Sequence, residues 1–286
     1  GSSGETSAVP SISSILSPND PITVIDLGAS LTSDERPVYD ALIESGLAKL
    51  VAFEPDEAAL RELSKRYPEP NICLPLFVGD GERHTYFATN WGPTGSLFEP
   101  NSELLKKFHY LHEITTVLST HEVHTVRLDD IPELTDADFM KIDTQGSESM
   151  IFENGQRLLS TVTVIQTEVN WVEMYKGMPL FSDIDRVLRR LGFVWHTRLG
   201  CGYRPFLPFL NPDHFQQAFR QELWGDVVYV RDWMRFDQVP AGKLMKMAVI
   251  LHDFYGSYDL CHLALKSADM QAGTNHAETY GHWMST

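Results

Sequence analysis

The sequence predicts a doubly wound α/β fold, in which helices cover both faces of a mostly parallel sheet of seven strands. Three apolar runs stop at an acidic residue or just before a glycine, and they are Ile22–Leu27, Leu50–Glu54 and Phe139–Asp143. Continuous apolar strands are typical of parallel sheets that are covered on both faces. Helical patterns separate the runs, and such alternation indicates an α/β architecture.

Four further strands complete the expected sheet. They are residues 72–78, 162–168, 193–197 and 227–230, and we expect the last to run antiparallel at an edge. Among the helices between the strands, one follows Asp56, whose side chain suits an N-cap.

Composition shifts divide the chain into four parts. Residues 1–20 are expected to be a flexible lead-in, and residues 21–232 a single domain with an insertion at about 82–127. Residues 233–268 are expected to form a C-terminal helical extension and residues 269–286 a loose tail. The apolar stripes within 242–268 leave two roles open, because they suit either an edge of the sheet or a contact in a homo-oligomer.

Charge and cysteine usage limit the possible partners. The net charge is −16, and such a surface repels a phosphate backbone, so nucleic acid is not an expected partner. No apolar stretch of about 18 residues suggests a membrane span. The three cysteines are isolated, which argues against a disulfide framework. We therefore expect a cytoplasmic protein that acts on a small molecule.

Strand ends supply the candidate cofactor site, because ligands of open α/β sheets bind beyond the carboxyl ends of the strands. Gly28 permits a close backbone approach, Glu54 can accept from a ribose diol, and Asp80 can accept from an adenine amino group. The glycine-rich fingerprint of dinucleotide sites is absent after the first strand. These features favour S-adenosylmethionine. The expected cofactor-binding residues are Asp26, Gly28, Ala29, Ser30, Glu54, Pro55, Asp80 and Asp143.

Seven phrases between residues 22 and 200 resemble one known family. They are Val-Ile-Asp-Leu-Gly-Ala (24–29), Ala-Phe-Glu-Pro (52–55), Gly-Ser-Leu-Phe-Glu-Pro (95–100), Arg-Leu-Asp-Asp-Ile (127–131), Asp-Phe-Met-Lys-Ile-Asp-Thr-Gln-Gly-Ser-Glu (138–148), Gln-Thr-Glu-Val (166–169) and Tyr-Lys-Gly-Met-Pro-Leu-Phe (175–181). In this respect the chain resembles the FkbM-type S-adenosylmethionine-dependent methyltransferases.

The resemblance implies a class I methyltransferase (Rossmann-like) fold and transfer of a methyl group to a hydroxyl oxygen. Many acceptors of such enzymes are sugars or secondary metabolites. The chain departs from the family after its first strand, where Ser30 and Thr32 replace an Asn and a Gly.

Three residues are candidates for catalysis. Lys141 and Asp143 alternate with apolar residues on one strand and so share one side of it. Glu168 ends the next strand of the sheet. We expect Asp143 to position the cofactor or the acceptor, and Glu168 to accept the hydroxyl proton or to orient the hydroxyl. Lys141 needs an acidic partner if it is buried, and Asp143 or Glu168 is the expected one.

Substrate contacts are expected from Ser96, Trp171 and Tyr175, which fall in loops above the site. We expect the two loops, residues 91–100 and 171–180, to be mobile without substrate. No metal site is expected, because the carboxylates near the strand ends lack a clear fourth ligand. Two other functions stay open: a nicotinamide-dependent oxidoreductase, and a catalytically silent cofactor-binding or assembly protein.

Overall fold

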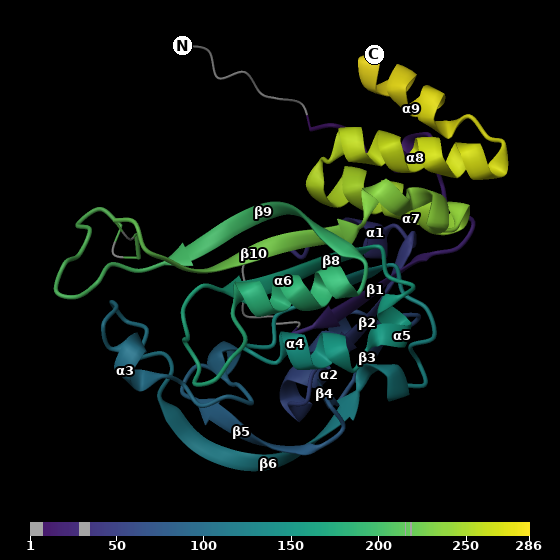
Figure 1. Cartoon of the computed structure of the whole chain (residues 1–286). Coiled ribbons are helices and arrows are strands. Elements are labelled where there is room, and N and C mark those ends of the chain that lie inside the picture. The colour runs from purple at the N-terminus through teal and green to yellow at the C-terminus, as the bar shows by residue number, and fades with distance from the viewer. Residues whose placement is uncertain (1–7, 29–34, 215, 218) are drawn as a thin grey trace. The chain divides into compact units, whose positions relative to one another are not determined.

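A computed structural model describes residues 8–28, 35–214, 216–217 and 219–286 (Figure 1). The chain forms two compact units. One consists of Gly1–Ile22, Val38–Ala48 and Trp233–Thr286, and the other of Thr23–Pro37 and Lys49–Asp232. The second unit carries nearly all of the motifs that the sequence singles out.

A seven-stranded sheet has the order β3-β2-β1-β7-β8-β10-β9. Its strands are β1 (Ile22–Leu27), β2 (Ala48–Phe53), β3 (Ile72–Leu74), β7 (Phe139–Ile142), β8 (Val164–Asn170), β9 (Phe193–Tyr203) and β10 (Glu222–Arg231). The pairs that β1 forms with β7, β7 with β8 and β2 with β3 are parallel, whereas β10 is antiparallel to both of its neighbours. This mostly parallel sheet confirms the predicted fold class, and its order is that of the class I methyltransferase fold.

The last strand, β10, is antiparallel as expected but does not lie at an edge. It pairs with β8 on one side and β9 on the other, so β9 is the edge strand. Val227, Val228, Tyr229 and Val230 are all buried, although their side chains alternate between the two faces. Burial on both faces is the mark of an interior strand, which corrects the expectation.

The strand expected at residues 72–78 is in fact two strands in two sheets. β3 ends at Leu74, and β4 (Phe77–Gly79) belongs to a three-stranded sheet of order β4-β6-β5. Pro75 lies between them and has no backbone N–H for a strand ladder. As a consequence, Asp80 follows a strand of the smaller sheet and not of the central one.

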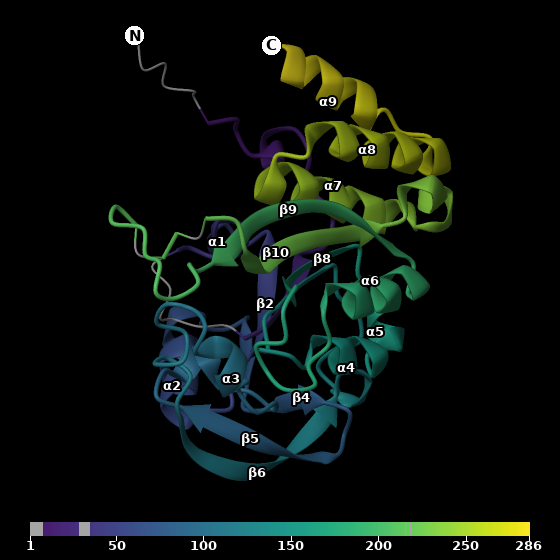
Figure 2. The ribbon, with the colours of Figure 1, turned by 60° about the vertical axis from the view of Figure 1, so that its left-hand side comes forward.

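The insertion expected at about 82–127 builds most of the smaller sheet. Its elements are β5 (Arg83–Thr89), η2 (Gly92–Thr94), α3 (Ser102–Leu105) and β6 (Val117–Arg127). β5 and β6 lie side by side as an antiparallel pair (Figure 2). The insertion also shares a small core with the loop after β8, made of Leu105, Phe108, Leu111, Met174, Tyr175, Met178 and Leu223.

The main core surrounds the central sheet. Its helical elements are α2 (Glu57–Arg66), η3 (Leu128–Asp130), α4 (Glu148–Glu153), α5 (Gln156–Leu159) and α6 (Phe181–Arg190). Asp56 caps α2 as predicted, because its Oδ2 accepts the Ala59 N–H at 2.8 Å. Leu188 of α6 is fully buried among residues of β7, β8 and β10.

The other unit is mainly helical. It contains η1 (Ile12–Ser14), α1 (Asp40–Glu44), η4 (Trp233–Gln238), α7 (Ala241–Tyr255), α8 (Tyr258–Ala272) and α9 (His276–Ser285). No helix among the described residues is both long and apolar enough to cross a membrane.

Both ends of the chain are more ordered than expected where the structure describes them. The supposedly loose tail holds the end of α8 and all of α9, because the carboxylate of Asp269 accepts the N–H groups of His276 and Ala277 at 2.9 and 2.7 Å. In the lead-in, Ile12 is fully buried and its N–H donates to Asp253 Oδ1 at 3.0 Å. Ile12 is therefore docked, and Leu16 is also buried.

Candidate active site

The closest backbone approach in the site joins Gly28 to Asp143. β1 and β7 are parallel neighbours, and the Asp143 N–H donates to the Leu27 carbonyl at 2.9 Å. Gly28 has a φ of 99°, and a Cβ there would lie 2.0 Å from the Asp143 carbonyl oxygen. Glycine is therefore required. Ala29 and Ser30, the next predicted cofactor residues, lie outside the described part of the chain.

Lys141 forms its ion pair with Asp26 on the neighbouring strand, whereas Asp143 or Glu168 was the expected partner. It stands opposite Asp26 in the β1–β7 register, and its Nζ is 3.9 Å from Asp26 Oδ2. The charge of Asp26 raises the pKa of Lys141, although burial of the ammonium opposes this effect. Asp26 is only 1% exposed. Lys141 is thus a fixed positive charge at the centre of an acidic site.

Asp143 and Glu168 form the central feature of the site. β7 and β8 are parallel neighbours, as predicted, and the two carboxyl side chains hydrogen-bond to each other. Burial, followed by the charge of Asp143, raises the pKa of Glu168 well above its usual value. Burial also raises the pKa of Asp143, but the charge of Lys141 opposes it. These effects favour the proton on Glu168 and the charge on Asp143.

A third carboxyl group, from Asp226, was not anticipated from the sequence. Asp226 stands opposite Glu168 in the β8–β10 ladder. Burial, followed by the charge of Asp143, raises its pKa to about 6. The sequence did contain a signal for a functional role of Asp226, because it is the one charged residue in the run Leu223–Val230.

Glu148 holds the turn between β7 and α4. Its Oε1 accepts the Thr144 N–H at 2.9 Å, and its Oε2 accepts the Gly146 N–H at 3.0 Å. The residue is 3% exposed, and burial raises its pKa to about 7. Both carboxyl oxygens of Glu148 are therefore occupied by backbone N–H groups, so the residue stabilises the turn.

Two of the residues predicted to contact substrate are buried and hydrogen-bond to Gln145 in the turn between β7 and α4. Ser96 and Tyr175 are each 2% exposed. The Ser96 hydroxyl donates to the Gln145 carbonyl at 2.6 Å, and the Tyr175 hydroxyl donates to the Thr94 carbonyl at 2.7 Å. Trp171, the third, is partly buried, and a Cβ at Gly225 would lie 2.5 Å from its ring.

The two loops that carry these residues are joined by backbone hydrogen bonds. The Asn101 N–H donates to the Met174 carbonyl and the Lys176 N–H to the Glu99 carbonyl, both at 2.8 Å. Pro100 and Tyr175 also form an isolated β-bridge. Residues 91–100 and 171–180 are therefore coupled to each other.

Glu54 is placed as expected for a cofactor ligand at the end of β2. Its N–H donates to the Leu74 carbonyl at 3.0 Å, and its Oε1 accepts the Asp56 N–H at 2.9 Å. These bonds fix the direction of a half-buried carboxyl group, whose pKa burial raises. Pro55 follows and is exposed.

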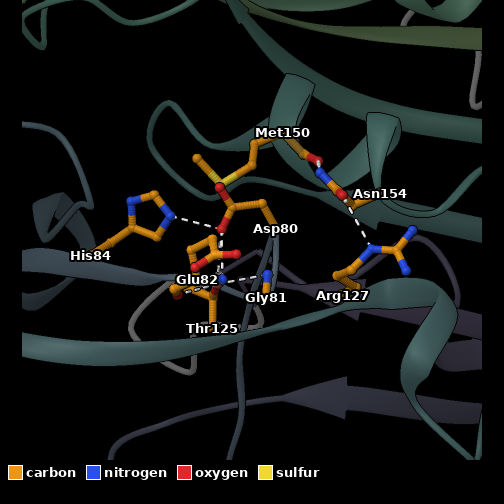
Figure 3. A network of polar contacts seen from close by, with 8 residues as sticks. All are labelled: Asp80, Gly81, Glu82, His84, Thr125, Arg127, Met150 and Asn154. Carbon is orange, nitrogen blue, oxygen red and sulfur yellow. Dashed lines mark hydrogen bonds and ion pairs between the residues drawn. The ribbon is translucent and has the colours of Figure 1, made fainter.

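Asp80 uses one carboxyl oxygen to close its own turn at the end of β4 (Figure 3). Its Oδ1 accepts from His84 Nε2 at 2.8 Å, the Glu82 N–H at 3.0 Å and the Thr125 hydroxyl at 3.2 Å. Burial alone would raise the pKa of Asp80, but the His84 bond and the other two hold it below its usual value. A contact from Asp80 to adenine remains a prediction.

Within the described ranges, no three His, Cys, Asp or Glu side chains are grouped as a metal ion would require. Glu148 accepts from the backbone of its turn, and Asp143 accepts from the side-chain Nε2 of Gln145.

Comparison with known proteins decides the family. Residues 26–195 match the model of the methyltransferase FkbM domain, which is more than half of the chain. The chain belongs to the FkbM methyltransferase family. A curated relative, the 2-O-methyltransferase NoeI of Sinorhizobium fredii (strain NBRC 101917 / NGR234), is 28% identical over 188 residues, which are 61% of this chain and 74% of the relative.

Two solved methyltransferase structures are also similar. Magnesium protoporphyrin IX methyltransferase (ChlM) from Synechocystis PCC 6803 with bound SAM is 13% identical, with 74% of this chain and 71% of that chain covered and a TM-score of 0.35. A TehB-like SAM-dependent methyltransferase from Corynebacterium glutamicum is 11% identical, with 74% and 82% covered and a TM-score of 0.35. Scores this low add nothing to the fold assignment from strand order.

The FkbM methyltransferase is an S-adenosylmethionine-dependent enzyme, and its residues fit that cofactor. Gly28 is exposed at the end of β1 and has no side chain to cover its backbone, and the half-buried Glu54 carboxylate at the end of β2 suits a pair of ribose hydroxyls. The carboxyl groups around Lys141 suit the positive charges of the cofactor's methionine part.

Proposed function

We propose that this FkbM methyltransferase transfers the methyl group of S-adenosylmethionine to a hydroxyl oxygen of a sugar or secondary metabolite. The feature that carries the proposal is the pair of carboxyl groups of Asp143 and Glu168, which the parallel strands β7 and β8 bring side by side. The printed name of the relative NoeI, a 2-O-methyltransferase, also supports oxygen as the acceptor atom. The cofactor supplies an electrophilic methyl group on a positively charged sulfur.

An alcohol is a weak nucleophile, and its proton becomes acidic as the oxygen gains a bond to carbon. A base within hydrogen-bond reach therefore accelerates the step. The sequence favoured Glu168 for proton transfer or for orienting the hydroxyl. Because Glu168 already holds a proton, we assign it the orienting role and assign proton acceptance to the ionised Asp143.

The surroundings of Asp143 suit this task. Its raised pKa increases its affinity for a proton, while Lys141 keeps it ionised at rest. Both Asp143 and Glu168 are only partly buried, so the pair retains a face toward an acceptor. Alignment of the acceptor hydroxyl with the cofactor supplies the rest of the rate enhancement.

The proposed cofactor residues are Gly28 for close backbone approach, Glu54 for the ribose diol and Asp80 for the adenine amino group. Asp26 acts through Lys141, which it holds in place.

The test of the function starts from an acceptor. Sugars, glycosides and polyhydroxylated metabolites are incubated with S-adenosylmethionine that carries a labelled methyl group, and label transfer is followed by mass spectrometry. Asp143→Asn and Glu168→Gln keep shape and remove charge, and the exposed residues Asp213→Asn and Glu103→Gln are matched controls. Label on a hydroxyl oxygen that depends on Asp143 supports the proposal. Label on nitrogen alone, or stabilisation by NAD and not by S-adenosylhomocysteine, contradicts it.

A further inference from the structure

Gln145 occupies an unusual backbone conformation beside Asp143. It lies in the turn between β7 and α4 and has a φ of 54°, which few non-glycine residues adopt. Such strain persists only where surrounding contacts hold it, and it collects at functional sites. The contacts of Gln145 therefore indicate what it does.

Each polar group of Gln145 except its N–H has a partner in a different segment. The side-chain Nε2 donates to Asp143 Oδ1 at 2.7 Å, and the side-chain Oε1 accepts from the Tyr175 hydroxyl at 3.1 Å. The backbone carbonyl accepts from the Ser96 hydroxyl at 2.6 Å. The insertion, the β7–α4 turn and the loop after β8 thus meet at this one residue.

The direction of the amide follows from its two neighbours. An ionised Asp143 can only accept, so the NH₂ group must face it, since two facing oxygens would repel. The Oε1 atom then faces Tyr175. Burial, followed by the charge of Glu168, raises the pKa of Tyr175 well above its usual value, so its hydroxyl stays protonated. Its single proton is shared between the Thr94 carbonyl at 2.7 Å and Gln145 Oε1 at 3.1 Å.

We propose that Gln145 is a positioning residue for methyl transfer, which keeps the negative charge of the carboxyl pair on Asp143 and the proton on Glu168. The inference rests on the proposed function, because it concerns the same pair. A donor to a carboxylate favours its ionised form.

The other charged and titratable groups around the pair make this donor important. Only Lys141 among them is cationic, and the rest are acids or a neutral phenol. They are Asp26 on β1, Lys141 on β7, Glu148 on α4, Asp226 on β10 and Tyr175 in the loop after β8. Without the amide, the three carboxyl groups of Asp26, Glu148 and Asp226 would disfavour charge on Asp143, and only Lys141 and the Glu168 hydrogen bond would favour it.

The experiment replaces the amide and measures the protonation of the pair directly. Gln145→Met keeps the length of the side chain and removes the donor, and Gln145→Glu adds a further acid to the site. The matched control is Gln156→Met, since Gln156 is exposed on α5 and donates only to the Glu153 carbonyl among its recorded bonds. Carboxyl carbons are labelled with ¹³C, and their NMR shifts are followed against pH in the protein without ligand.

In Gln145→Met we expect the pH midpoint of Asp143 to rise by about one unit, because a hydrogen bond to a charged group is lost. Gln145→Glu should raise it further, and Gln156→Met should not move it. Once an acceptor is known, the pH profile of kcat should move up by the same amount, with KM and S-adenosylhomocysteine affinity changed less than threefold. If Gln145→Met does not fold, Gln145→Asn keeps a residue that tolerates the left-handed backbone and is too short to reach Asp143.

An unchanged Asp143 midpoint in the Gln145 variants, or an equal shift in Gln156→Met, would overturn the inference while leaving the proposed function intact. A shifted Asp143 midpoint in the Gln145 variants, combined with wild-type turnover in Asp143→Asn, would contradict the proposed function. The effect of Gln145 on the charge of Asp143 would then stand, but Asp143 would have no role in catalysis.

Discussion

Asp226 on β10 stands directly opposite Glu168 on β8, so two carboxyl groups share one face of an antiparallel ladder. Like charges in this position destabilise a sheet. Both groups respond with a raised pKa, and in each case burial is the largest cause. Together with Asp143, they place three carboxyl groups with raised pKa values at one end of the sheet.

The first prediction concerns the stability contribution of Asp226. Its folded pKa of about 6 lies above the unfolded value, so the folded state binds more protons between about pH 4 and pH 6. Stability therefore falls as pH rises through that window. Asp226→Asn removes the penalty, and the free energy of unfolding in urea should exceed that of the wild type by ~1–2 kcal/mol at pH 7.5. The two proteins should converge near pH 4. If the wild type and Asp226→Asn are equally stable at pH 7.5 as well as at pH 4, the ionised Asp226 carboxylate does not destabilise the folded state.

The second prediction concerns Glu148, which accepts two backbone N–H groups. Glu148→Gln keeps one side-chain oxygen as an acceptor and replaces the other with an amide NH₂ group. One of the two N–H groups, of Thr144 or Gly146, therefore loses its acceptor. We expect a loss of ~1–3 kcal/mol in the free energy of unfolding at pH 8, where the wild-type group is ionised. Glu103→Gln on the exposed face of α3 is the control. Equal unfolding midpoints for the two variants would mean that the turn does not depend on this carboxylate.

The third prediction concerns Gly28. Gly28→Ala combines a left-handed backbone with a Cβ that meets the Asp143 carbonyl at 2.0 Å, whereas Gly177→Ala has a φ of 74° but open space around it. Strain of the left-handed backbone costs about 1–3 kcal/mol in both variants. Gly28→Ala should lose clearly more stability and should also lose the thermal shift given by S-adenosylhomocysteine. A retained shift of wild-type size in Gly28→Ala would remove this glycine from the cofactor site.

The fourth prediction concerns the coupled loops. We expect residues 91–100 and 171–180 to exchange amide hydrogens together, because two backbone bonds and the Tyr175 hydroxyl join them. Tyr175→Phe should speed exchange in both loops, whereas Tyr110→Phe, at an exposed position, should not. Independent exchange of the two loops, measured by mass spectrometry, would contradict the coupling.

Several strands of the central sheet could be predicted from the sequence. The strands at Ile22–Leu27 and Phe139–Asp143 were predictable because an uninterrupted apolar run that ends at an acid is a local signal. The neighbouring positions of Asp143 and Glu168 followed from the order of a parallel sheet.

Other features depend on partners that are distant in the chain. Nothing local shows that β10 inserts between β8 and β9, so Asp226 could not be placed in the site beforehand. The division of residues 72–78 between two sheets depends on pairing with β2 and β6. Pro75 was the one local signal that the strand could be interrupted there. The left-handed backbone of Gln145 is fixed by Tyr175 and Ser96, and no propensity of glutamine predicts it.

The most direct test of the central claim is the single-turnover rate of methyl transfer to a hydroxyl acceptor, compared between the wild type and Asp143→Asn. If Asp143 accepts the hydroxyl proton, the rate should fall by about 10²–10⁴-fold, while the affinity for S-adenosylhomocysteine falls far less. A wild-type rate in Asp143→Asn, with Asp213→Asn also at the wild-type rate, would contradict the account.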